Sequence, residues 1–67
     1  MAAIYKLINL VGISSESYED AVKNAVKKAG ETLESLAWFE IVEHRGSISN
    51  TGEIQFQAVL KLAFEIK

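Results

Sequence analysis

The sequence predicts an α+β fold in which a three-stranded antiparallel sheet packs on one helix. Two periodicities indicate this class. In residues 54–66 every even position is apolar and most odd positions are polar, a period that only a strand places on one face. In residues 18–36 the apolar residues recur at intervals of three and four, which is the helical period. With two further apolar segments around the helix, the predicted order is strand, helix, strand, strand.

The first strand is predicted over residues 3–11, and Gly12 is expected to end it. Both of its faces carry apolar side chains: Tyr5, Leu7 and Val11 on one face, and Ile4, Ile8 and Leu10 on the other. Strands that are apolar on both faces are normally covered on both. We therefore expect this strand to be buried from both sides.

A helix is predicted from Tyr18 to about Leu36. Ser17 has the side chain of a typical N-cap, and Asp20 stands three residues later as a short version of the capping-box acid. The apolar stripe holds small residues near its start, so the first turns should approach a sheet closely. Gly30 falls inside the predicted helix, at an expected cost of about 1 kcal/mol relative to alanine.

The second strand is predicted over residues 38–45, followed by a turn from Gly46 to Gly52 and a third strand over residues 53–67. A helical connection favours a parallel arrangement of the first two strands, whereas the turn makes the third antiparallel to the second. The third strand should therefore lie in the middle of the sheet. At about 3.3 Å per residue it would be roughly 45 Å long, so we expect it to extend past its own subunit's sheet.

The chain of 67 residues is expected to form a single domain, residues 1–67, that associates with further copies. Ordering such a chain costs about 100 kcal/mol, which about 4,000 Å² of buried apolar surface would balance. So small a domain rarely buries that much alone, and it has no cysteine for a disulfide. Since 49% of the residues are hydrophobic, the surplus apolar surface predicts a homo-oligomer.

Composition also limits the classes of partner and the cellular location that we expect. A net charge of −2 argues against nucleic-acid binding, which usually requires a basic patch. No apolar run reaches the roughly 18 residues of a membrane span, and the N-terminal residues lack the pattern of a secretory signal. We expect a cytoplasmic protein that binds neither nucleic acid nor membrane.

The sequence contains no recognisable catalytic constellation, and we do not expect an enzyme. His44 is the one histidine and there is no cysteine, so the usual nucleophilic schemes depend on a single side chain. A metal site needs more ligands than this histidine and scattered glutamates offer. The four glycines are far apart, which excludes a glycine-rich phosphate loop.

Three side chains suit contact with a ligand, and each has a simpler alternative. Trp38, the one tryptophan, would be either a core or interface residue or a stacking platform for a flat molecule. Gln57 would be either a solvated residue or an amide that hydrogen-bonds a heterocycle alternating C=O and N–H. Arg45 would either reach a phosphate or pair with a glutamate across subunits.

Segments spread along nearly the whole chain form one pattern. They are Tyr5-Lys6, Leu10-Val11-Gly12, Ser14, Ala21, Ala25, Ala29, Thr32-Leu33, Trp38-Phe39-Glu40-Ile41, Arg45-Gly46, Phe56-Gln57 and Phe64. In order and spacing, this pattern resembles the dodecins. The tryptophan, arginine-glycine and glutamine elements coincide with the strand, helix, strand, strand order, which makes the resemblance specific.

The resemblance implies a hollow, roughly spherical homododecamer that binds flavins non-covalently and stores or buffers them. Trp38 would stack on the isoalloxazine ring, and symmetry-related copies of it would sandwich a pair of flavins. Gln57 would hydrogen-bond the pyrimidine edge of the ring, and Arg45 would lie near the flavin. The implied cofactors are FMN, riboflavin or lumichrome. Sequestration would quench the excited state of the bound flavin and keep the flavin from reacting with oxygen.

Coenzyme A is a second ligand that the resemblance implies. Lys6 and Lys28 match two of the basic positions linked to it, and Thr32 and Leu33 lie close by in the sequence. Glu65 departs from the arginine expected in such members; this charge reversal opposes coenzyme A binding, and Lys67 would partly compensate for it. The alternative function is a structural or protein-interaction module without a small-molecule ligand. An enzyme that uses bound flavin for electron transfer is a third hypothesis.

Overall fold

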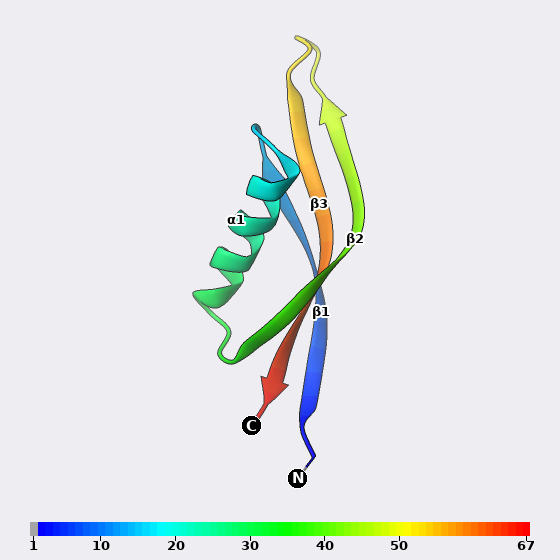
Figure 1. Cartoon of the computed structure of the whole chain (residues 1–67). Coiled ribbons are helices and arrows are strands. Elements are labelled where there is room, and N and C mark those ends of the chain that lie inside the picture. The colour runs from blue at the N-terminus through cyan, green and yellow to red at the C-terminus, as the bar shows by residue number, and fades with distance from the viewer. Residues whose placement is uncertain (1) are drawn as a thin grey trace.

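The computed structural model describes residues 2–67, which form three strands and one helix (Figure 1). In chain order these are β1 (Ile4–Ser14), α1 (Tyr18–Gly30), β2 (Leu36–Ile48) and β3 (Ile54–Ile66). The strands form one sheet in the order β1-β3-β2, and β3 is antiparallel to both neighbours. The predicted fold class and the central place of β3 are confirmed.

The sheet is long and narrow, and α1 covers only part of it. The molecule extends 54 × 21 × 15 Å along its principal axes. The prediction that β3 extends past its own sheet is wrong. The ladder with β2 covers β3 from Ile54 to Phe64, and the ladder with β1 covers it from Phe56 to Ile66. The β2–β3 hairpin projects instead, beyond the N-terminal end of α1 (Figure 1).

Two strands are longer than predicted because pairing with β3 continues through glycine. Gly12 lies opposite Ala58, and β1 continues past it to Ser14. Gly46 lies opposite Phe56, and β2 continues past it to Ile48, so the turn is shorter than predicted. The low strand propensity of glycine is a weak local preference that tertiary pairing overrides.

The helix ends at Gly30, six residues before the predicted end near Leu36. The backbone N–H groups of Thr32 and Leu33 both donate to the carbonyl of Ala29, which tightens the last turn. Leu33 and Leu36 remain half-buried, Leu33 in the connection to β2 and Leu36 as the first residue of β2. The helical spacing thus continued into a segment that is not helical. Gly30 is the last helical residue, so the cost expected for an interior glycine does not arise.

The N-terminus of α1 is capped as predicted. Ser17 has extended backbone angles, and its side chain accepts a hydrogen bond of 3.0 Å from the backbone N–H of Asp20. The hydroxyl of Ser14, at the end of β1, donates to the Asp20 carboxylate at 2.6 Å. That hydroxyl also accepts from the backbone N–H of Glu16 at 2.9 Å. The last residue of β1 and the first turn of α1 are therefore joined directly.

We expect Ser17→Ala to lower the free energy of unfolding by about 1 kcal/mol, because it leaves a helical N–H without its side-chain acceptor. Urea unfolding at one fixed protein concentration measures the change, with Ser15→Ala at an exposed neighbouring position as the matched control. An equal loss in both variants would show that the cap is not the cause.

The core consists of small helical residues packed on β1 and on the middle strand β3. Ala21, Ala25 and Ala29 are buried along one side of α1. Three residues at even positions of β3, Ala58, Leu60 and Leu62, are buried with them. The small side chains of α1, with Gly12 beneath them on β1, allow the helix backbone to approach the sheet closely. The predicted stripe and its closeness to the sheet are confirmed for the first turns.

Much apolar surface is left open in the single subunit. The large hydrophobic residues that are exposed are Ile4, Tyr5, Leu7, Val11, Ile13, Trp38, Phe39, Ile41, Val42, Ile48, Ile54 and Ile66. In one subunit α1 covers part of one face of β1, so coverage of both faces, as the sequence predicts, would require a second copy. Monomeric proteins rarely expose contiguous apolar surface on this scale, and large patches usually mark contact sites.

Candidate functional site

The sheet face that points away from α1 carries two of the candidate ligand residues side by side. Gln57 is at an odd position of β3, whereas the even positions face the helix, and Arg45 lies directly opposite it on β2. The Nε atom of Arg45 donates to the Oε1 atom of Gln57 at 3.0 Å. The Nε2 atom of Gln57 donates to the Oε1 atom of Gln55 at 2.9 Å. The Gln57 amide therefore both accepts and donates a hydrogen bond within the subunit.

The charge of Arg45 is only weakly compensated. Its Nη1 atom is 3.6 Å from a carboxylate oxygen of Glu43, and both side chains are about half exposed. Exposed ion pairs contribute about 0 to 1 kcal/mol, so this pair does not prevent Arg45 from meeting an anion. This ion pair lies within one subunit, so both alternatives for Arg45, a phosphate contact and a salt bridge across subunits, stay predictions.

Trp38 lies near the start of β2, opposite Ala63, and 48% of its surface is exposed. It is not a core residue of the subunit, so an interface residue and a stacking platform are the remaining interpretations. Along β3, Ala63 is six positions from Gln57. Six strand residues span about 20 Å. One subunit therefore does not bring Trp38 and Gln57 together, and a small ligand touching both would take them from two subunits.

The sequence analysis did not identify Tyr5 as a partner of Trp38. The centroids of the two rings are 4.8 Å apart and their planes meet at 60°. Tyr5 lies on β1 opposite Glu65, and Trp38 lies on β2, so the contact bridges the two outer strands. The sequence signal was the alternation in the first strand, which placed Tyr5 on an apolar face. The strand register that brings Tyr5 to Trp38 can be seen only in the folded sheet.

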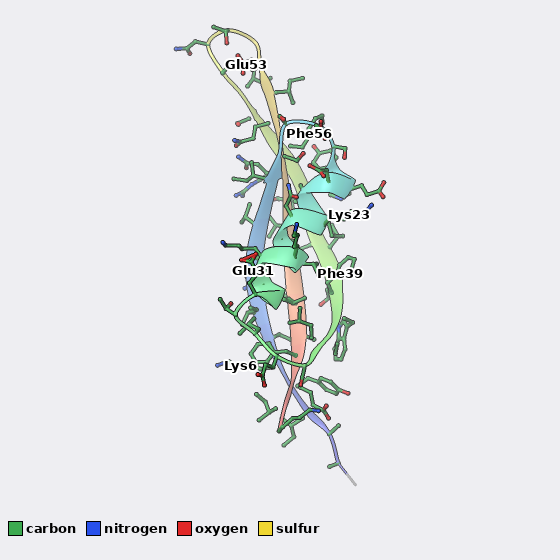
Figure 2. The ribbon with its side chains drawn as sticks, turned by 90° about the vertical axis from the view of Figure 1, so that its left-hand side faces the viewer. Lys6, Lys23, Glu31, Phe39, Glu53 and Phe56 are labelled. Atoms are coloured by element: carbon green, nitrogen blue, oxygen red, sulfur yellow. The ribbon has the colours of Figure 1, made fainter. Side chains whose placement is uncertain are left out.

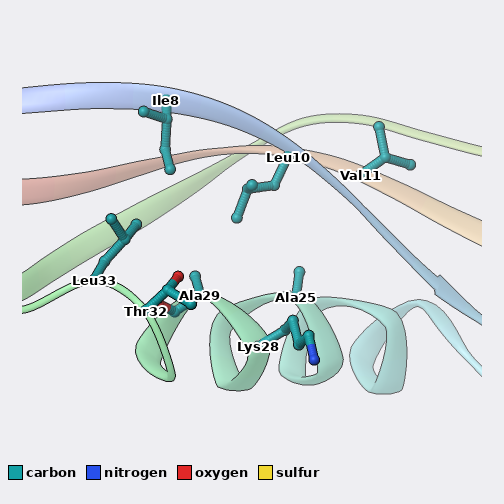
Figure 3. A pocket seen from close by; sticks show the side chains of 8 residues that line it. All are labelled: Ile8, Leu10, Val11, Ala25, Lys28, Ala29, Thr32 and Leu33. Atoms are coloured by element: carbon teal, nitrogen blue, oxygen red, sulfur yellow. The ribbon is translucent and has the colours of Figure 1, made fainter.

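Three of the residues linked to coenzyme A lie together. Lys28, Thr32 and Leu33 line a groove of about 440 Å³ between α1 and β1, where Ile8 and Leu10 point toward the helix (Figure 3). The Lys28 Nζ atom is 3.3 Å from a carboxylate oxygen of Glu31, and both side chains are exposed. The groove is apolar along the strand and basic at one side.

The other basic position lies outside this groove. Lys6 is exposed on β1 opposite Phe64, and Figure 2 shows it below the helix, on the same side as Glu31. Glu65 is at an odd position of β3 and thus on the face away from α1. Its carboxylate is 3.7 Å from the Lys67 Nζ atom. Within one subunit the charge reversal at Glu65 therefore falls on the opposite sheet face from the groove.

His44, the one histidine, lies among aromatic rings. His44 stacks on Tyr18, with ring centroids 4.5 Å apart, and Phe56 meets Tyr18 edge-on at 5.1 Å. The histidine thus belongs to an aromatic cluster at the start of α1. In residues 2–67 there is no group of three or more histidine, cysteine, aspartate or glutamate side chains arranged to hold a metal ion. Over the same residues, no helix is long and apolar enough to cross a membrane.

Comparison with known proteins decides the family. The family model for the dodecins matches residues 4–67. The chain belongs to the dodecin family. It is 40% identical over 67 residues to the dodecin of Thermus thermophilus, covering all of this chain and 97% of that protein. At 25% identity it also matches a Mycobacterium tuberculosis protein named calcium dodecin, covering 97% of this chain and 92% of that one.

Solved dodecin structures have the same fold as this chain. The crystal structure of the tt0972 protein from Thermus thermophilus superposes with a TM-score of 0.91 at 39% identity, covering 98% of this chain and 97% of that one. The dodecin from Streptomyces davaonensis superposes with a TM-score of 0.92 at 31% identity, covering 100% and 98%. The resemblance noted in the sequence and the fold class it implied are both confirmed.

Proposed function

We propose that this member of the dodecin family binds flavins non-covalently and stores them in a homododecameric cage. The observation that carries the proposal is the half-exposed Trp38 on a sheet face that a single subunit leaves open. FMN and riboflavin are the expected guests, with lumichrome as a smaller relative. The function is buffering and photoprotection of the flavin in the cytoplasm, and the chain acts as one binding domain rather than as an enzyme.

Two features support a site between subunits. Trp38 and the Arg45–Gln57 pair lie about 20 Å apart along the same sheet face, which exceeds the reach of one flavin ring. The same subunit exposes large apolar side chains on both sheet faces. Association of copies would cover this apolar surface and bring the tryptophan of one subunit toward the polar pair of another. Assembly and ligand binding are thus two consequences of the same exposed surface.

The chemistry of each residue suits a flavin. The indole of Trp38 offers a flat electron-rich face, and stacking of a flat heterocycle on an aromatic ring contributes about 1 to 3 kcal/mol. The amide of Gln57 can donate and accept, as the edge of the pyrimidine part of the flavin requires. Its present partners, Arg45 and Gln55, would have to exchange for the ligand. Stacked indole would also quench excited flavin by electron transfer.

A fluorescence titration tests the proposal. Riboflavin and FMN are titrated with protein whose assembled mass is known from light scattering. The expected result is strong quenching that saturates at a fixed flavin-to-subunit ratio on a particle of twelve copies. A protein that leaves the fluorescence of both flavins unchanged would favour the alternative, a structural or interaction module without a small-molecule ligand.

We expect Gln57→Ala to weaken riboflavin binding by about 1 to 3 kcal/mol, because polar atoms of the buried ring edge would lose their partner. Asn50→Ala is the control, since it removes an amide side chain at an exposed position of the turn between β2 and β3, away from Gln57. Riboflavin titration of both variants measures the difference. Equal weakening in the two variants would contradict a direct hydrogen bond from Gln57 to the flavin.

Coenzyme A is a second proposed ligand, supported by the groove that collects Lys28, Thr32 and Leu33. To bind its phosphates, Lys28 would have to give up its ion pair with Glu31. Lys6 lies outside the groove, so it would contact the far end of the ligand or act from another subunit. Calorimetric titration of the flavin-free protein with coenzyme A tests this proposal separately, because the groove and Trp38 lie on different faces of the sheet.

A further inference from the structure

We propose that Tyr5 is a positioning residue that holds the indole of Trp38 ready for a flat ligand. The proposal depends on the proposed flavin-binding function and adds to it a residue on β1. The two ring centroids are 4.8 Å apart with an interplanar angle of 60°. Tilted pairs at this spacing are among the favoured arrangements of aromatic rings, because the edge of one ring meets the face of the other.

The geometry of the sheet shows that the side chains of Tyr5 and Trp38 incline toward each other. Tyr5 lies on β1 opposite Glu65, and Trp38 lies on β2 opposite Ala63, with β3 between the two strands. Neighbouring strands are about 4.8 Å apart, so the backbones of β1 and β2 are separated by roughly 10 Å. Ring centroids at 4.8 Å therefore require both side chains to lean across β3 toward each other.

Ala63 provides the space in which the rings meet. It lies on β3 between Leu7 and Trp38 and points away from α1, yet none of its surface is exposed. The side chains of its cross-strand neighbours must therefore cover it. A larger residue would occupy the space beneath the two rings and push them apart. This accounts for an apolar residue at an odd position of β3, where most side chains are polar.

The contact restrains the indole while leaving it accessible. Trp38 keeps 48% of its surface exposed although Tyr5 lies against it. An unrestrained aromatic side chain on a surface exchanges between rotamers, and a ligand that stacks on it must immobilise it. Because Tyr5 already limits this motion in the free protein, part of the entropic cost of binding has been removed before the ligand arrives.

The test compares Tyr5→Leu, which removes the ring, with Tyr5→Phe, which keeps it. Ile4→Ala is the control, since Ile4 lies at the same end of β1 but on the opposite face. Two readouts are needed: the riboflavin dissociation constant and the near-ultraviolet circular dichroism of the tryptophan bands in the flavin-free protein. We expect Tyr5→Leu to bind riboflavin about 3- to 10-fold more weakly and to lose tryptophan dichroism. Tyr5→Phe and Ile4→Ala should retain both.

Riboflavin binding by Tyr5→Leu at the affinity of the unmodified protein would overturn the positioning role. So would equal losses in Tyr5→Leu and Tyr5→Phe, because the ring would then not be the cause. If the unmodified protein binds no flavin, the proposed function fails. The tryptophan dichroism of Tyr5→Leu then decides alone: its loss supports the positioning of the indole, and its persistence overturns it.

Light scattering establishes whether each variant assembles. If Tyr5→Leu does not assemble, the Ala63→Val variant is tested in its place. This substitution adds bulk beneath the rings and removes no aromatic side chain. Weaker riboflavin binding with reduced tryptophan dichroism in an assembled Ala63→Val protein supports the proposal. Unchanged values of both overturn it.

Discussion

Replacing Trp38 with alanine should abolish most of the flavin quenching and weaken riboflavin binding by about 5- to 150-fold. The range corresponds to about 1 to 3 kcal/mol of stacking for each ring. The subunit should still fold, since the indole is half exposed and lies outside the core of small residues under α1. Fluorescence titration measures the loss, and light scattering on the same sample shows whether the assembly is intact.

Trp38→Phe separates stacking from quenching. Phenylalanine keeps an aromatic face at the same position but is a poorer electron donor than indole. We expect this variant to bind riboflavin more tightly than Trp38→Ala while quenching it less than the unmodified protein does. Full quenching in an assembled Trp38→Ala protein would contradict the stacking role and would place the flavin elsewhere.

Replacing Gly12 with alanine should cost about 3 kcal/mol or more, because the helix backbone lies directly above this residue of β1. A β-carbon there would overlap the carbonyl oxygen of Ala21 and come within 3.0 Å of the β-carbon of Ala25. A backbone carbonyl cannot turn aside as a flexible side chain can, so α1 would have to move away from the sheet. A domain of this size is stable by about 3 to 10 kcal/mol, so much of that stability would be lost.

Gly30→Ala is the matched control for this prediction. A β-carbon at Gly30 would meet the Leu36 side chain at 3.6 Å, which is ordinary van der Waals contact. The same substitution should therefore be neutral or stabilise the protein by up to about 1 kcal/mol through the higher helix propensity of alanine. Urea unfolding at one protein concentration compares the two. A similar loss in both variants would show that the close approach of α1 to Gly12 is not the cause.

The sequence identified candidate ligand residues, but not which of them lie next to one another. The one tryptophan, a glutamine on the polar side of a strand and an arginine beside a glycine were identifiable as candidates. The structure pairs Arg45 with Gln57 at 3.0 Å and keeps Trp38 well away from them along the strand. Which candidates meet depends on register, and register is set by contacts between strands that are far apart in the chain. For the same reason Tyr5 could not be assigned to Trp38.

The sequence alone determined the α+β class, the start of α1 at its Ser17 cap and the central strand with its apolar even positions. These features depend on hydrogen bonds and periodicities within a few residues of each other. Only the tertiary structure decided that α1 stops at Gly30, that β1 and β2 continue through glycine, and that Tyr5 reaches Trp38 across β3. The physical reason is that pairing with the middle strand outweighs local preference and brings together side chains that no local pattern connects.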